Sequence, residues 1–185
     1  DGWSWRELFR RAPRWVRVPV YLLSAVAALL VLLLVVGFVV VRYPLPQVEG
    51  SVALPGLDAE VEVVRDVHGI PQIYAETDAD LMRAQGYVHA QERFFQMDLR
   101  RHATAGRLSE LFGEQTLEQD KMVRTMGWRR VAEQEWGLLR VDTKEALTAY
   151  AAGVNAYLAE RGTAEISAEY SVLRLTGLGY HPEEW

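Results

Sequence analysis

The 185-residue sequence contains no cysteine. This absence excludes disulfides, zinc–thiolate sites, iron–sulfur clusters and thiol nucleophiles from the chain. The glycine-rich phosphate loop, the Gly-x-Ser-x-Gly nucleophile elbow and the His-Glu-x-x-His zinc motif are also missing. None of the histidines (His68, His89, His102 and His181) pairs with another at a metal-binding spacing. Half of the residues are hydrophobic and 24% are charged, which excludes wholesale disorder.

Basic residues are scarce outside the N-terminus. Of the 20 basic and 25 acidic residues, six arginines and two acids fall within residues 1–42, which leaves 14 basic and 23 acidic residues in the remainder. An acidic body repels phosphate backbones, whereas sequence-independent nucleic-acid binding needs the opposite sign. The sequence therefore predicts no nucleic-acid partner.

A long apolar run lies near the N-terminus. Val18 to Val41 contains no charged residue, and the stretch from Val20 onward is mostly Val, Leu, Ala and Phe. Twenty-two residues at about 1.5 Å each give about 33 Å of helix, against a hydrocarbon core of about 30 Å. A cleaved signal peptide is the alternative, but its apolar run would be about 7–15 residues. We therefore predict an uncleaved single-pass anchor at 18–42, whose partner is the lipid bilayer.

The charges around this run predict its orientation. Five arginines precede the run, whereas Arg42 alone follows it closely. The positive-inside rule then predicts a cytoplasmic basic segment at 1–17 and a body outside the cytoplasm. Binding of the arginines to anionic lipid is the alternative to a topology signal. Two prolines and a glycine predict an extended linker over 43–58, and the remaining domain spans 59–185.

The body begins with two short strand patterns. Residues 61–66 alternate as a strand does, residues 67–71 form a Gly–Pro turn, and residues 73–75 provide a second strand. A hairpin of two strands is marginal in water without further strands or a packed helix. We therefore expect these strands to join a sheet that other residues supply.

Helical patterns fill most of the rest. Residues 77–80 read as a helix start, with Asp78 and Asp80 as first-turn acids rather than calcium ligands. The helix that follows is apolar over much of its circumference, so the polar residues interleaved on it need partners. Further helices are expected at 107–113, at 117–136 and from a capping-box-like start at 142–145 to residue 161.

No active site is evident from the residue types. His89 is interpreted as a hydrogen-bonded core residue, with a catalytic base as the alternative. None of the six serines has an identifiable base beside it in the sequence.

Several segments nevertheless share the order and spacing of a known family. They are Val-Arg-Asp-x-x-Gly-Ile-Pro-x-Ile-Tyr-Ala at 64–75, Ala-Gln-Gly-Tyr-Val-His-Ala-Gln-Glu-Arg-Phe-Phe-Gln-Met-Asp-Leu-Arg-Arg at 84–101, Gly-Arg-Leu-Ser-Glu-Leu-Phe-Gly at 106–113, Asp120 with Arg124, and Tyr-Ala-x-Gly-Val-Asn-Ala at 150–156. Together they resemble the small α chain of the penicillin acylase (penicillin amidase) family. The resemblance covers about two thirds of the sequence.

The resemblance implies an N-terminal-nucleophile hydrolase. In that family a precursor cleaves itself into a smaller α chain and a larger β chain that begins with the catalytic residue, usually Ser. The α-amino group of that residue serves as the base, and an amide is hydrolysed through an acyl-enzyme. The fold is a four-layer αββα sandwich completed by both chains, commonly with calcium between them.

For this chain the resemblance implies an α+β class: a mostly helical α-chain part of that sandwich, preceded by one transmembrane helix. The nucleophile and oxyanion hole would lie on the β chain, so no catalytic residue, metal ligand or cofactor is assigned here, and calcium is expected only in the complete αβ enzyme. Tyr87 is the one candidate for lining the substrate cleft, with a core tyrosine as the alternative. Three further groups are interpreted as buried polar ties, meaning buried polar side chains that hold the α/β assembly together rather than act in catalysis. They are Arg65 and Asp66, residues 91–93, and residues 100–101.

Two functions follow from the resemblance. The first is a membrane-anchored extracytoplasmic amidohydrolase that works with the β chain of the same precursor. Its substrate would be a small linear amide, such as an N-acyl amino compound, a β-lactam side chain or an acyl-homoserine lactone. The alternative is a non-catalytic accessory subunit that keeps the fold as a scaffold in a membrane complex.

Overall fold

The computed structural model describes residues 13–175, 177 and 180–185. The chain divides between Arg42 and Tyr43 into two compact units, each described separately below. Most of the basic segment expected at 1–17 lies outside the described residues.

The described part of the first unit forms one long helix, α2, from Arg14 to Arg42. It begins four residues before the predicted anchor, so Pro19 lies inside the helix rather than at its entry. Its most apolar window has a mean hydropathy of 3.1, and no residue of that window is buried. The Ser24 hydroxyl donates to the carbonyl of Val20 at 2.8 Å, which satisfies a polar group on the apolar helix. The helix is therefore long and apolar enough to cross a membrane.

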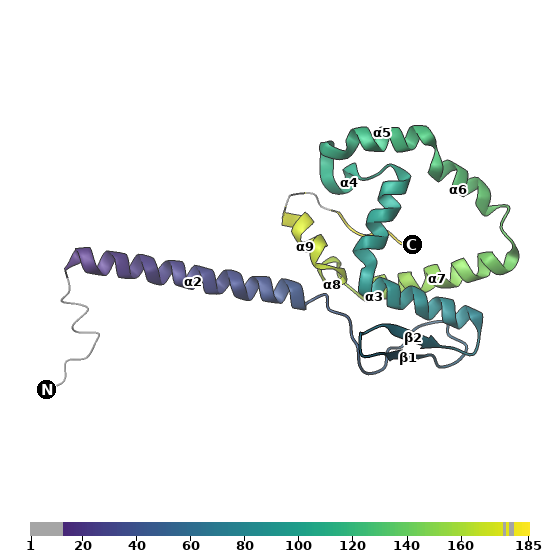
Figure 1. The fold of residues 1–185 in the computed structure, drawn as a ribbon, viewed down its shortest axis with the longest axis horizontal. Coiled ribbons are helices and arrows are strands. Elements are labelled where there is room, and N and C mark those ends of the chain that lie inside the picture. The colour runs from purple at the N-terminus through teal and green to yellow at the C-terminus, as the bar shows by residue number, and fades with distance from the viewer. Residues whose placement is uncertain (1–12, 176, 178–179) are drawn as a thin grey trace. The chain divides into compact units, whose positions relative to one another are not determined.

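The second unit opens with the predicted hairpin (Figure 1). Strand β1, Glu62–Arg65, pairs antiparallel with β2, Pro71–Tyr74, in a register that places Val63 opposite Ile73. The connecting turn is held by the Asp66 carboxylate, which accepts from the backbone N–H groups of His68 and Ile70. Gly69 in this turn has φ +78°, a left-handed conformation that favours glycine.

The longest helix of the second unit is α3, Asp78–Ala105. Thr77 caps its start by accepting from the N–H of Asp80 at 3.1 Å, as the sequence predicted. Arg93 has non-helical dihedrals, with φ −143°, and divides the helix at a kink that is visible in Figure 1. Gly106 ends the helix in the left-handed conformation.

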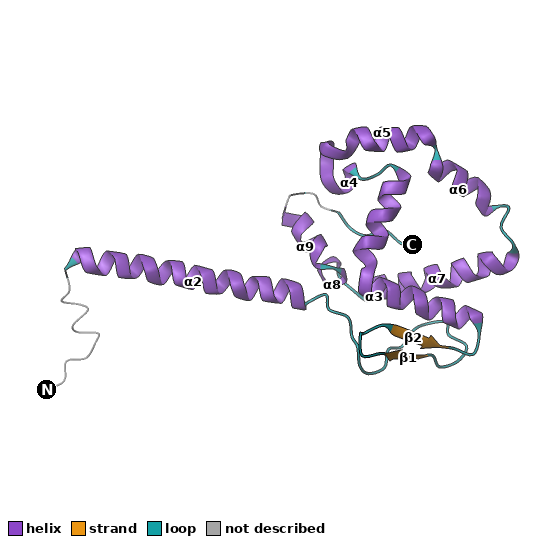
Figure 2. Ribbon diagram, in the orientation of Figure 1, coloured by secondary structure: helices purple, strands orange, loops and turns teal. Residues whose placement is uncertain are grey.

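Short helices follow α3 (Figure 2). They are α4 (Ser109–Phe112), the 3₁₀ turn η1 (Gly113–Thr116), α5 (Leu117–Met126) and α6 (Trp128–Trp136). The prediction of a single helix over 117–136 is therefore wrong, because the segment forms two helices. Gly127, at φ +76°, ends α5 and starts α6 in a new direction.

Helix α7, Val141–Ala159, packs along α3. The predicted capping box at its start is wrong, because Arg140 precedes the helix without a side-chain cap and Asp142 instead binds Arg140. Two glycines let the helices approach closely. A Cβ added to Gly86 would lie 2.1 Å from the carbonyl oxygen of Tyr150, and one added to Gly153 would lie 1.9 Å from that of Arg83.

The core lies between α3, α7 and two final helices, α8 (Thr163–Ile166) and α9 (Ala168–Leu175). Its buried members are Tyr87, Ala90, Phe94, Val154, Tyr157, Ile166 and Tyr170. The segment 180–185 returns to this core. Its Trp185 exchanges two hydrogen bonds with the Asn155 side chain, and its ring lies 4.7 Å from the guanidinium carbon of Arg101.

Candidate functional site

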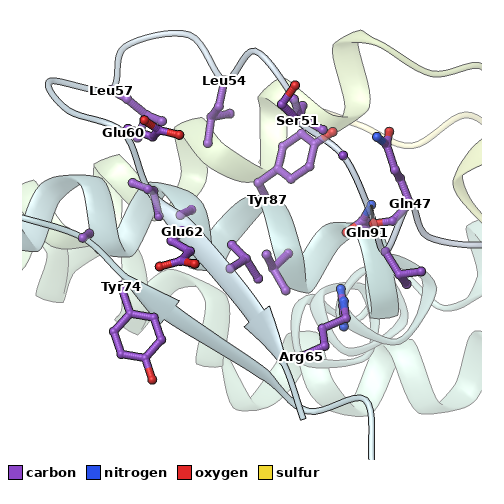
Figure 3. Close-up of a pocket in the computed structure, with 18 of the residues that line it drawn as sticks. Gln47, Ser51, Leu54, Leu57, Glu60, Glu62, Arg65, Tyr74, Tyr87 and Gln91 are labelled. Carbon is purple, nitrogen blue, oxygen red and sulfur yellow. Dashed lines mark hydrogen bonds between the residues drawn. The ribbon is translucent and has the colours of Figure 1, made fainter. Parts of the chain in front are cut away.

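A cleft of about 1000 Å³ lies between the hairpin, the segment before it and α3 (Figure 3). Its lining comes from residues 47–57, from residues 60–65 with β1, from residues 74–76 at the end of β2, and from one face of α3. The α3 face contributes Ala84, Tyr87, Val88 and Gln91. Segments distant in sequence thus form one concave surface in the second unit.

Tyr87, the candidate for substrate contact, lines this cleft and also belongs to the core. Its side chain extends from α3 between Leu54 and Ser51 (Figure 3), and its residue is 7% exposed. The ring meets Tyr157 edge to face at 5.5 Å, and the hydroxyl lies 3.5 Å from a carboxylate oxygen of Glu160. Burial, followed by the charge of Glu160, raises the pKa of the Tyr87 hydroxyl. Its contact with substrate stays a prediction.

Polar side chains of α3 hold the wall formed by residues 43–58. Buried Asp80 accepts from the backbone N–H of Asp58 at 3.0 Å and of Ala59 at 3.3 Å. The N–H of Asp58 is the largest influence on the Asp80 carboxyl, whose pKa is lowered. Arg83 donates to the carbonyl of Pro55, and Gln91 donates to the carbonyl of Gln47. The segment expected as a linker therefore packs along the domain.

The hairpin is held by an ion pair. Arg65 of β1 binds Glu92 of α3, with side chains that are 16% and 20% exposed. Arg65 and Glu92, which belong to two of the groups predicted as polar ties, thus bind each other. Arg93 and Arg100 are exposed in this chain, and their role as ties stays a prediction.

A second polar cluster surrounds Asp98 on α3, which is fully buried. Its carboxylate accepts from the Tyr170 hydroxyl at 2.7 Å and from Arg101 at 3.0 Å, and His102 Nδ1 lies 3.3 Å away. Burial alone would raise the pKa of Asp98, but the hydrogen bonds from His102 and Tyr170 outweigh it and lower the pKa. Sequence reasoning missed the contact with Tyr170, because it joins residues 72 positions apart.

His89 on α3 is hydrogen-bonded, as predicted. Its Nδ1 lies 3.0 Å from the Tyr150 hydroxyl of α7, and its side chain is half-buried. No set of three or more His, Asp or Glu side chains among the described residues is placed to hold a metal ion. The cleft lining includes Ser51, but neither a histidine nor a lysine of the described part of the chain lines the cleft with it. Ser51 therefore has no histidine or lysine beside it in the described lining of this cleft.

The family model for penicillin amidase matches residues 60–185. This chain belongs to the penicillin amidase family, as its motifs predicted. Its sequence is 44% identical over 141 residues to penicillin acylase 2 proenzyme of Pseudomonas sp. (strain SE83). The aligned residues make up 76% of this chain and 17% of that protein. It is 35% identical over 141 residues to the acyl-homoserine lactone acylase QuiP of Pseudomonas aeruginosa. The aligned residues make up 76% of this chain and 16% of that protein.

The fold agrees with the sequence comparison. The structure resembles a thermostable penicillin G acylase from Alcaligenes faecalis, with a TM-score of 0.55 and 27% identity over 68% of this chain and 65% of that chain. The mostly helical second unit thus resembles the penicillin acylase fold. The chain spans only about a sixth of the length of the curated relatives above.

Proposed function

We propose that this chain is the α-chain part of a membrane-anchored, extracytoplasmic amidohydrolase that cleaves linear amides of N-acyl compounds. The observation that carries the proposal is the 44% identity to a penicillin acylase proenzyme over 141 residues, or 76% of this chain. The relatives are named as acylases of penicillin and of acyl-homoserine lactones. Both substrate types contain an acyl group joined to an amine through a linear amide.

In this proposal the catalytic machinery belongs to a larger β chain cut from the same precursor. One observation supports it, because a relative that is 44% identical is named a proenzyme. The hydroxyl or thiol at the β-chain N-terminus would attack the amide carbonyl, and its proton would pass through the α-amine to the departing amine. Water would then hydrolyse the acyl-enzyme and release the acid.

The part played by this chain is to complete the β-chain fold and to shape the cleft. Tyr87 lines the cleft, and its hydroxyl lies 3.5 Å from a carboxylate oxygen of Glu160. We place it at the acyl side of the substrate, where loss of the ring would raise KM more than it lowers kcat. Tyr87→Phe keeps the ring and should be close to neutral, whereas Tyr87→Leu should raise KM.

Anchoring in the cell membrane is supported by α2, which is long and apolar enough to span a bilayer. The arginines before it favour a cytoplasmic N-terminus by the positive-inside rule. An enzyme held in this way would act on amides outside the cytoplasm.

The function is tested by assaying release of free amine from N-acyl substrates by the complete purified protein. Turnover is expected from the complete protein and should disappear when the first β-chain residue is changed to alanine. Residues 1–185 expressed without the rest should give none. A correctly processed complete protein that releases no amine from penicillins, acyl-homoserine lactones or N-acyl amino acids would favour the accessory-subunit alternative.

A further inference from the structure

Residues 43–59, here named the strap, are fastened to the second unit at several points along their length. Gln91 of α3, which is 6% exposed, donates to the carbonyl of Gln47 at 3.0 Å. Asp80 of α3, which is 1% exposed, holds the far end of the strap through two backbone N–H groups, as described above. Because buried side chains hold it, the strap is a fixed part of the second unit rather than a free spacer.

The first residue of the strap is fastened as well. Tyr43 follows directly after Arg42, the last residue of α2. Its hydroxyl donates to one carboxylate oxygen of Glu165 at 2.8 Å. The other carboxylate oxygen of Glu165 accepts from the backbone N–H of Gly162 at 2.9 Å, at the start of α8. One carboxylate therefore joins the beginning of the strap to α8.

The chain that leads from α2 into the strap is short and stiff. Pro44 and Pro46 fix φ at two of the residues between Tyr43 and Gln47. A fully extended chain of the length from Arg42 to Gln47 spans at most about 18 Å. If α2 spans a bilayer, the hydrogen bond at Gln47 therefore lies within that distance of the membrane surface.

The side chains at the start of the strap suit the edge of a bilayer. Tyr43 is 56% exposed and Leu45 is 49% exposed, although both belong to a fastened segment. Tyrosine is enriched at the membrane–water interface, where an amphipathic ring contacts apolar and polar layers at once. The prolines on either side of Leu45 have no backbone N–H that would need a partner where lipid displaces water. Residues 43–46 therefore fit a lipid surface.

We propose that the strap holds the second unit against the membrane, with residues 43–46 and the start of α8 facing the lipid headgroups. Tyr43 and Leu45 then lie in the interfacial layer. The lipid bilayer is thus the partner of a surface of the second unit and not of the anchor alone. The inference rests on the part of the proposed function that anchors α2 in a membrane, and it does not depend on the enzymatic activity.

The test uses vesicles that contain the complete protein and lipids with a nitroxide on the headgroup. A nitroxide quenches a fluorescent label only at short range. This chain has no cysteine, so single labels can be placed at Ala164→Cys on α8 and at Met122→Cys on α5. Met122 is 59% exposed, and α5 lies away from the strap in the second unit (Figure 1).

The label on α8 should lose most of its fluorescence, whereas the label on α5 should lose little. Equal quenching at the two sites would overturn the proposal. So would the absence of quenching on α8, which would show that something other than lipid covers this surface.

A longer tether tests whether the strap is the cause. A spacer of about 20 Gly and Ser residues between Arg42 and Tyr43 keeps every hydrogen bond of the strap but adds about 25 Å of flexible chain on average. Quenching on α8 should then fall to the level measured on α5. Unchanged quenching in the spacer variant would overturn the role of the strap.

A single substitution tests the contact at the start of the strap. Tyr43→Phe removes the hydroxyl that binds Glu165 and should lower quenching on α8. The matched control is Tyr74→Phe, because Tyr74 is also 56% exposed and its hydroxyl binds Gln72 on the same strand. The control should leave quenching on α8 unchanged, and an equal loss in both variants would contradict a specific role for Tyr43.

The proposals fail in different ways. Extraction of the unmodified protein by alkali refutes the anchor on which the strap depends. A protein that stays in vesicles but shows no quenching on α8 refutes the strap alone. Absence of amide hydrolysis refutes the proposed enzyme and leaves the quenching pattern readable.

Discussion

Asp98 is the residue on which the buried polar cluster depends. It has no exposed surface, and its carboxylate binds both Tyr170 and Arg101. Removing one member of such a buried charged set leaves the others unpaired, at a typical cost of about 3–5 kcal/mol. Asp98→Asn should therefore lower the free energy of unfolding of the complete protein by that order in urea titration. Asp142→Asn, at an exposed site, should change it by less than about 0.5 kcal/mol, and equal effects would refute this role.

His102 should make stability depend on pH. Burial disfavours the charged imidazole, but the hydrogen bonds from its ring to Asp98 outweigh this and raise the pKa of His102 above its ordinary 6.5. A raised folded pKa gives stability that is fully present below pH 6.5 and is lost as the pH rises through the folded value.

The measurement is the difference in unfolding free energy between the unmodified protein and His102→Gln, followed from pH 5.5 upward. This difference should shrink as the pH rises. The charged groups that face the ring come from α3, the loop after it, α4 and the C-terminal segment. They are Asp98, Arg107, Glu110 and Glu183. A difference that grows with pH would show that the imidazole is neutral in the fold.

At the scale of elements, the packing of α3 on α7 depends on two glycines. Alanine at either position would place Cβ about 2 Å from a backbone carbonyl oxygen of the facing helix, so the helices must separate. Overpacking of this kind typically costs about 1–3 kcal/mol, occasionally more. Gly86→Ala and Gly153→Ala should each lower the thermal midpoint by several degrees. Gly137→Ala, whose Cβ would meet an atom no closer than 3.5 Å, should not.

The elements show where sequence reasoning succeeds. The hairpin and the start of α3 could be predicted because turn residues and the Thr77 cap act locally. The break at Gly127 was missed because the apolar period continues on both sides of it. The start of α7 was misplaced because Asp142 binds the preceding Arg140 rather than capping the helix. Such choices between local partners are decided by tertiary context.

The candidate site was less predictable than the elements. Tyr87 could be proposed from a motif, but the cleft around it depends on contacts between distant segments. Asp80 illustrates the difference. The sequence marks it as a first-turn helix acid, whereas the fold uses its carboxylate to hold the backbone of residues 58 and 59, more than 20 positions earlier.

At the scale of the whole molecule, the proposed role of α2 is to anchor the protein in a membrane. Replacing residues 1–42 of the precursor by a cleavable secretion signal should release the complete protein into the soluble extracytoplasmic fraction. The unmodified protein should stay with membranes through high-salt and alkaline washes and leave them only in detergent, because about 30 Å of apolar helix is buried in lipid. Extraction of the unmodified protein by alkali would contradict anchoring by α2.

The central claim is that this chain works with a β chain that begins with the nucleophile. The most direct test is the intact mass of every polypeptide in the purified complete protein, with N-terminal sequencing of the companion. The account predicts a second chain several times larger than 21.0 kDa that begins with Ser, Thr or Cys. An uncut precursor, or a companion that begins with any other residue, would contradict it.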